Sequence, residues 1–245
     1  MASSAPDLTT RLLRRERLIV AGGLVLLVLL CWWFVIGGAG MPRGMAAMQT
    51  PPFGALVLMW WLMMLAMMLP SAAPAVLLYA RVRQIRGGDA QIGATSMFLA
   101  GYVATWFVFS LIASFAQTLL TGPSMALDNR VLEAGVLIAA GVYQLTPLKS
   151  ACLRECRSPA EFISRHWRPG WDGAAQLGLR HGLYCLGCCW TLMALLFVGG
   201  VMNLLWVVGL TLIVAAEKLA PRGEIIGRIA GAALVTWGLA KLAGF

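Results

Sequence analysis

Apolar residues run along nearly the whole chain in long stretches, and short polar segments separate them. Each stretch is close to the roughly 20 residues that a helix needs to cross about 30 Å of hydrocarbon. The pattern predicts an all-α, polytopic membrane helix bundle with about seven transmembrane helices. The expected spans are residues 18–36, 54–79, 94–120, 131–148, 177–198, 203–219 and 224–243.

Two of these spans need a turn between them. The apolar run from 177 to 219 is too long for one crossing, and "FVGGVMN" (197–203) offers glycines and an asparagine for a tight reversal. Glycine is also tolerated inside membrane helices, so six spans remain an alternative. Before the first span, residues 1–17 form a basic N-terminal arm, expected in the cytoplasm, and residues 18–245 form a single transmembrane domain.

The first span resembles the core of a signal peptide, but we expect it to be retained. Its apolar core is long, no A-x-A cleavage site follows it, and Cys31 lacks the small preceding residue of a lipoprotein site. No remaining stretch is polar enough to form a soluble catalytic domain.

The charge supports a membrane location rather than nucleic-acid binding. The chain carries a net charge of +9, although only 12% of its residues are charged and 60% are hydrophobic. With seven spans, 16 of the 19 Lys and Arg residues fall on one side of the membrane. Such an excess marks the cytoplasmic side, which predicts a cytoplasmic N-terminus, an outside C-terminus and the lipid bilayer as the main partner.

Methionines gather near the second span. Thioethers are soft ligands suited to Cu(I), but methionine is also an adaptable packing residue. Met59, Met63 and Met67 fall within an arc of about 80° on a helix. Pro70 and Pro74, which follow them in the sequence, predict a kink in this helix. The expected metal route comprises Met41, Met45 and Met48 in the outer loop, Met59, Met63 and Met67, and Met193 on the fifth span.

Cysteines mark the opposite side of the membrane. Cys152 and Cys156, spaced i, i+4 in a cytoplasmic loop, would lie close together on a helix, and His166 follows them. Because the cytoplasm is reducing, this pair favours a metal or redox site over a structural disulfide.

The fifth span carries the densest group of thiols. His181, Cys185 and Cys188 share one helical face, and Cys189 lies beside it. Thiolates, thioethers and imidazole without a carboxylate cluster favour Cu(I) first and Zn(II) second. The spacing is not that of a ferredoxin cluster, and no bis-histidine pair for haem is evident. Buried cysteines that simply pack remain an alternative.

Polar residues are otherwise rare in the spans. Glu217 and Lys218 at the inner end of the sixth span are interpreted as a pair that reaches toward the interface, with a proton-carrying Glu217 as the alternative. Gln144 is expected to form a hydrogen bond across the bundle.

Four ordered motifs resemble a known bacterial family. "MMLPSAAPAVLLYA", "YQLTPLKSACLRECRSP", "GLYCLGCCWTLMALLFVGGVMNLLW" and "AAEKLAPRG" are similar to domain of unknown function 2182, described as predicted metal-binding integral membrane proteins. The resemblance covers about residues 53–243 and implies a location in the bacterial inner membrane. The cysteines in matching motifs are Cys152, Cys156, Cys185, Cys188 and Cys189, whereas Cys31 matches none.

We therefore expect a protein that binds Cu(I) at a cytoplasm-facing cysteine and histidine site and acts in metal transport or delivery. A metal chaperone or a recipient membrane metalloprotein is the expected partner. No nucleophile–base pair or phosphate-binding loop indicates a hydrolase or ATPase, so a non-enzymatic role is expected. The alternatives are a membrane thiol–disulfide oxidoreductase, in which the thiols exchange, and a structural accessory subunit.

Overall fold

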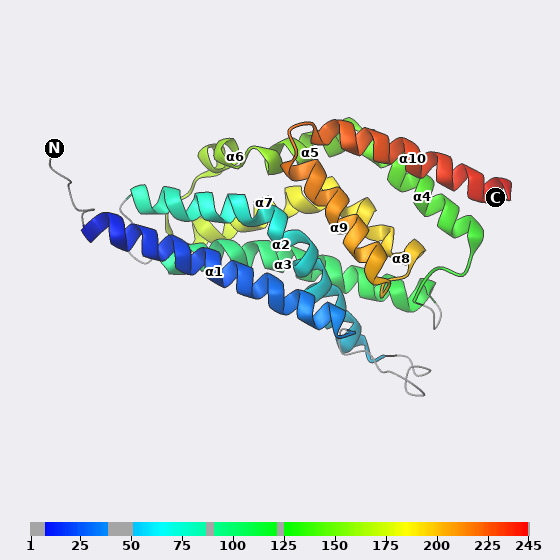
Figure 1. The fold of residues 1–245 in the computed structure, drawn as a ribbon, viewed down its shortest axis with the longest axis horizontal. Helices are drawn as coiled ribbons and strands as arrows, with labels where there is room; N and C mark the ends of the chain where they lie inside the picture. Colours follow the sequence, from blue (N-terminus) through cyan, green and yellow to red (C-terminus); the bar gives the residue numbers. More distant parts are fainter. Residues whose placement is uncertain (1–7, 39–50, 87–90, 122–124, 245) are drawn as a thin grey trace, which may run out of the picture.

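The computed structural model describes residues 8–38, 51–86, 91–121 and 125–244, and every element within these ranges is a helix. The predicted all-α class is confirmed. Figure 1 shows the long helices running side by side along an elongated bundle. In chain order they are α1 (Leu8–Ile36), α2 (Phe53–Ile85), α3 (Gln91–Leu120), α4 (Arg130–Gln144), α5 (Pro147–Arg157), α6 (Pro159–His166), α7 (Gly170–Ala194), α8 (Leu196–Gly199), α9 (Leu204–Leu219) and α10 (Gly223–Ala243).

Five segments in the described ranges are long and apolar enough to cross a membrane: Leu18–Ile36, Phe53–Ile85, Ile92–Leu120, Gly170–Gly199 and Gly223–Ala243. Helices α4 and α5 taken together are also long and apolar enough to cross a membrane, although a bend of 64° separates them. If they form one span, the number rises to six. The sixth predicted span, 203–219, corresponds to α9, which has only 16 residues.

The fourth predicted span differs most from the structure. It was expected to continue to residue 148, but α4 ends at Gln144 and a new helix begins at Pro147. Proline disfavours the helical conformation in the residue before it and is well suited to the first turn of a helix. Thr146 caps α5 by accepting a hydrogen bond from the Lys149 amide at 3.3 Å. This break turns the segment that bears Cys152 and Cys156 into a separate helix.

The turn between α7 and α9 lies where the sequence predicted it. Gly200 has a φ of +87°, which a side chain would strain, and Asn203 caps α9 by accepting from the Trp206 amide at 3.4 Å. On the N-terminal side, α7 begins at Gly170, seven residues earlier than expected. The α2 helix remains continuous through Pro70 and Pro74, and Figure 1 shows that its path bends along its length.

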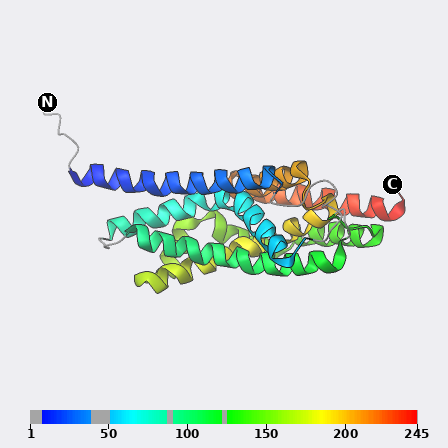
Figure 2. The same cartoon turned by 90° about the horizontal axis from the view of Figure 1, so that it is seen from below.

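Small residues allow the main helix pairs to approach closely. The α3 and α7 helices pack where a Cβ on Gly178 would overlap the Phe98 carbonyl, and α4 packs on α10 at Gly141 and Gly231. Close backbone approach at small residues is the usual packing mode of helices in lipid. The α1 helix lies along one side of the bundle against α2 (Figure 2) and leaves large side chains such as Leu29 and Trp33 exposed.

Candidate metal centre

Sulfur atoms from three helices meet in the interior of the bundle. The α7 helix contributes Cys185, Cys188 and Cys189, each at most 2% exposed, because their side chains contact residues of α2, α5 and α9. The α5 helix contributes Cys156, and α2 contributes Met68, which is fully buried. All of these cysteines are free thiols.

Two sulfur–sulfur contacts define the centre. The Sγ atoms of Cys156 and Cys188 lie 4.0 Å apart, and Cys189 Sγ lies 3.8 Å from Met68 Sδ. A metal–sulfur bond of about 2.3 Å lets two sulfurs on one ion lie up to about 4.6 Å apart. Each pair therefore fits a single soft ion. We refer to Met68, Cys156, Cys185, Cys188 and Cys189 as the sulfur cluster.

The thiols on α7 are oriented by their own backbone. Cys188 Sγ donates to the Cys185 carbonyl at 3.1 Å, and Cys189 Sγ donates to the same carbonyl at 2.9 Å. The C-x-x-C-C spacing places both thiols one helical turn beyond Cys185, where this carbonyl is within reach. The local sequence thus fixes the direction of two sulfur atoms.

Cys152 lies beside the cluster and is only half-buried. A Cβ at Gly187 would lie 2.8 Å from Cys152 Sγ, so the absence of a side chain at Gly187 gives this thiol its place against α7. The Tyr143 hydroxyl also donates to the Gly187 carbonyl at 2.6 Å. The two cysteines of α5 therefore both face α7.

A lysine lies among the sulfurs, contrary to the sequence interpretation. Lys218 was expected to reach toward the interface beside Glu217, but it is 6% exposed. Its Nζ lies 3.0 Å from Cys185 Sγ, 3.9 Å from Cys189 Sγ and 3.8 Å from Met68 Sδ. The position on α9 directs this side chain inward, which a single-helix pattern does not reveal.

Tyr102 on α3 completes the surroundings of Cys185. Its hydroxyl lies 3.1 Å from Cys185 Sγ and 3.4 Å from the Met68 carbonyl. The hydroxyl has one proton, so it donates to one of these two acceptors at a time. Tyr102 therefore connects the α2 and α7 sides of the sulfur cluster.

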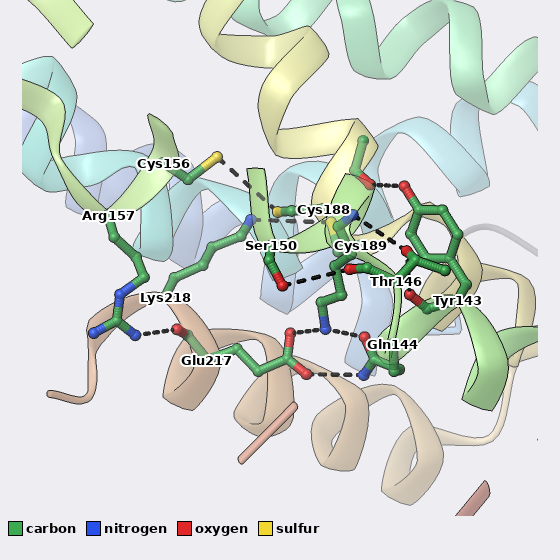
Figure 3. Close-up of polar contacts among 12 residues, drawn as sticks. Tyr143, Gln144, Thr146, Ser150, Cys156, Arg157, Cys188, Cys189, Glu217 and Lys218 are labelled. Carbon is green, nitrogen blue, oxygen red and sulfur yellow. Dashed lines mark hydrogen bonds and ion pairs between the residues drawn. The ribbon is translucent and has the colours of Figure 1, made fainter. Parts of the chain in front are cut away.

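Glu217 points away from Lys218 and belongs to a second buried group. Its carboxylate pairs with Lys149 Nζ at 2.6 Å and accepts a hydrogen bond from Gln144 at 2.8 Å. Lys149 also donates to the Gln144 side-chain oxygen. The expected cross-bundle hydrogen bond of Gln144 is thus present. Figure 3 shows Lys218 extending toward the α7 cysteines while the Glu217 carboxylate is turned toward Gln144.

The histidines lie next to the cluster rather than within its contacts. The His181 ring is buried between aromatic rings, 5.2 Å from Phe162 and 5.8 Å from Tyr102. Its Nδ1 is buried and has no hydrogen-bond partner among the described residues. His166 lies at the end of α6, and its Nδ1 is 3.0 Å from the Phe162 carbonyl.

The methionine stripe on α2 faces the interior. Met59, Met63 and Met67 are each at most 1% exposed, and Met193 on α7 is fully buried. The expected ligands Met41, Met45 and Met48 lie outside the described residues. A cavity of about 10 Å³ is lined by Met59, Met63 and also Met202, which the sequence interpretation did not include.

Within the described part of the chain, no group of three or more His, Cys, Asp or Glu side chains is arranged to hold a metal ion. The observed donors are instead pairs of sulfur atoms, one of which includes methionine. Structural Zn(II) sites are closed by four ligands, whereas Cu(I) accepts fewer and favours thiolate and thioether sulfur. The donor set fits Cu(I) better than Zn(II).

Comparison with known proteins agrees with this choice of metal. The family model PpoB2, described as copper chaperone, matches residues 57–241 and so covers all of the sulfur cluster. This range nearly coincides with the segment that resembles domain of unknown function 2182, but the copper chaperone family is the one that the match supports. No curated protein and no solved structure matches the chain. With most of its length matched, the chain belongs to the PpoB2 family of copper chaperones.

Proposed function

We propose that this protein is a membrane-embedded copper chaperone that binds Cu(I) in the sulfur cluster and delivers it to a recipient membrane metalloprotein. The observation that carries the proposal is the pair of sulfur contacts, Cys189 to Met68 at 3.8 Å and Cys156 to Cys188 at 4.0 Å. Thiolate and thioether sulfur is the donor type that selects Cu(I), and the family match is to copper chaperones.

The arrangement suits stepwise transfer between sulfurs. Cys185, Cys189 and Met68 lie deep in the bundle, whereas Cys156 and Cys152 are only half-buried. An ion that exchanges one sulfur ligand for its neighbour can move from the buried pair to the Cys156–Cys188 pair without release to water. Metal handover would then take place at α5, with Cys152 as the next thiol. Buried His181 supports the cluster from α7 and is a further ligand candidate.

The methionines extend this path toward the other end of α2. Met59, Met63 and Met67 lie one helical turn apart along the helix that also carries Met68. With Met193 they would form a thioether route, and the outer-loop methionines Met41, Met45 and Met48 would supply it. The chain thus offers soft ligands over most of the bundle length.

The helices and the charge support a membrane setting. Exposed apolar side chains on α1 and α3, such as Leu29 and Ile112, are suited to contact with lipid. We place seven spans in the bacterial inner membrane by counting α4 with α5 as one and α9 as another. The Lys and Arg excess then favours the cytoplasmic side for the N-terminus and for the C-terminal end of α5.

The first test is the metal content of anaerobically purified protein in detergent, measured by mass spectrometry. The triple variant Cys185→Ser, Cys188→Ser and Cys189→Ser should lose near-stoichiometric copper. The matched control is Cys31→Ser, because Cys31 is buried and free but lies on α1. A wild-type protein that binds no copper after reconstitution with Cu(I), or a triple variant that binds as much as the control, would overturn the proposal.

The thiol–disulfide alternative is tested in the same preparation. The 4.0 Å contact between Cys156 and Cys188 would need to shorten to the disulfide length of about 2.05 Å. Redox function requires a disulfide between these residues that forms and breaks with the redox poise. A copper chaperone instead keeps both thiols reduced in its loaded state, which mass spectrometry of alkylated peptides reports.

A further inference from the structure

The Lys218 ammonium lies among the sulfurs in a place where most proteins would avoid a charge. It contacts Cys185 Sγ at 3.0 Å, Ser71 Oγ at 3.5 Å, Met68 Sδ at 3.8 Å and Cys189 Sγ at 3.9 Å. The side chain is 6% exposed. A buried charge is costly unless a group of opposite charge lies close to it.

No carboxylate in the described part of the chain forms a salt bridge with Lys218. The adjacent Glu217 is turned away and paired with Lys149 at 2.6 Å. The charges of Glu217 and Lys149 neutralise one another, so Glu217 does not supply a counter-charge to Lys218. The groups placed to carry the opposite charge are therefore the thiols that the ammonium contacts, Cys185 at 3.0 Å and Cys189 at 3.9 Å.

The charges of this group depend on which ion is bound. Cysteines that ligate a metal do so as thiolates, so Cys185 and Cys189 would carry two negative charges and Met68 none. Lys218 reduces this sum to one negative charge. A monovalent ion such as Cu(I) makes the group neutral, whereas Zn(II) leaves it with one positive charge. In a low-dielectric interior a net charge is strongly disfavoured.

We propose that Lys218 is a specificity-determining residue that selects monovalent Cu(I) over divalent Zn(II) by supplying a fixed positive charge beside two thiolates. The proposal rests on the proposed function, because it concerns the same sulfur ligands. It assigns to Lys218 a role separate from ligation: the amine does not hold the ion, and its charge decides which ion leaves the buried group neutral. Cu(I) selection therefore comes from charge as well as from soft donors.

The test is a competition between Cu(I) and Zn(II) for anaerobically purified protein in detergent, with both bound metals counted by mass spectrometry. Lys218→Met removes the charge and keeps an unbranched chain of similar length. In this variant the charge of the two thiolates is balanced by Zn(II) rather than by Cu(I). The ratio of bound Cu(I) to bound Zn(II) should therefore fall by about tenfold or more, because the variant also loses the contact of a charged donor with the Cys185 sulfur, which is stronger than a contact between neutral groups. Lys218→Arg, which keeps the charge, should retain the wild-type ratio.

Lys218→Gln serves as a second neutral variant, and it keeps a polar end group beside Ser71 and Cys185. Both neutral variants should shift the ratio in the same direction, with wild-type elution in size-exclusion chromatography. An unchanged ratio in a folded neutral variant, while the wild type loads copper, would overturn the role of Lys218 and leave the proposed function intact. A wild-type protein that loads no copper would overturn the proposed function itself.

Discussion

Cys185 is the residue on which the contacts of the sulfur cluster converge. Its Sγ lies 3.0 Å from the Lys218 ammonium and 3.1 Å from the Tyr102 hydroxyl, and its carbonyl accepts from Cys188 and Cys189. Four side chains from three helices are thus positioned by one residue. Changes at Lys218 and Tyr102 should alter metal binding while leaving the sulfur ligands in place.

Tyr102→Phe should weaken Cu(I) binding about fivefold. The substitution removes the hydroxyl 3.1 Å from Cys185 Sγ and keeps the ring, and a hydrogen bond of this kind contributes about 1 kcal/mol. The measurement is competition with a Cu(I) chelator. Tyr79→Phe is the matched control, because the buried Tyr79 hydroxyl has no hydrogen-bond partner among the described residues. Equal affinities for the two variants would contradict the role of Tyr102.

Gly187→Ala should displace the Cys152 thiol without unfolding the protein. The added Cβ would lie 2.8 Å from Cys152 Sγ, which is the mobile end of a side chain. We expect faster alkylation of Cys152, measured by peptide mass spectrometry after timed labelling. Gly209→Ala, where nothing lies within 4 Å of the added Cβ, is the control. An unchanged alkylation rate would show that Gly187 does not position Cys152.

The residues of the cluster were only partly predictable. The spacing of Cys185, Cys188 and Cys189 indicated a shared helical face, since helix geometry alone fixes it. Lys218 was missed because its neighbours come from α2 and α7, and a pattern along α9 carries no information about them. His181 shares the face of Cys185 but packs among aromatic rings contributed by α3 and α6.

At the scale of elements, the break between α4 and α5 shapes the site. It lets α5 turn by 64° from α4 and lie against α7 with Cys156 facing Cys188. The buried group of Gln144, Lys149 and Glu217 ties both sides of the break to α9. Arg157 adds a hydrogen bond to the Glu217 carbonyl at 2.7 Å. These contacts hold the cysteine-bearing helix in place.

Glu217→Gln should therefore destabilise the protein strongly. It leaves the Lys149 ammonium, 2% exposed, without its counter-charge, and removing one partner of a buried ion pair costs about 3–5 kcal/mol. The midpoint of thermal unfolding in detergent should fall clearly. Glu161→Gln, in the exposed pair with Arg165, is the control and should change stability by about 1 kcal/mol or less. Similar midpoints for both variants would contradict the anchoring role.

The break between α4 and α5 has a signal in the sequence. Thr146 followed by Pro147 is typical of a helix boundary, but the predicted fourth span ran past this point to residue 148. The turn at 197–203 was predictable because glycine and asparagine coincide there with a run too long for one crossing. Turn-forming residues therefore predicted a turn correctly where the apolar run around them was also too long for a single span.

At the scale of the whole molecule, helical class and apolar character followed directly from composition and pattern. The number of spans did not, because α9 is short and α4 continues into a bent partner. Length criteria give five or six crossings, and the charge distribution favours seven. Six and seven spans differ in one observable property, since an odd number of spans places the two termini on opposite sides.

Reporter fusions at each end should therefore give opposite results. A reporter that is active only in the cytoplasm should work at the N-terminus, and one that is active only outside should work at the C-terminus. The excess of Lys and Arg on the N-terminal side is the physical reason. Termini on the same side would contradict seven spans and indicate six.

The most direct test of the central claim is copper K-edge X-ray absorption on the anaerobically loaded protein. The account predicts monovalent copper with a first shell dominated by sulfur, because the proposed ligands are the thiolates and the thioether of the sulfur cluster. The Cys185→Ser and Cys189→Ser double variant should lose this signature, whereas Cys31→Ser should keep it. Divalent copper, or a first shell dominated by nitrogen and oxygen, would contradict a copper chaperone built on the sulfur cluster.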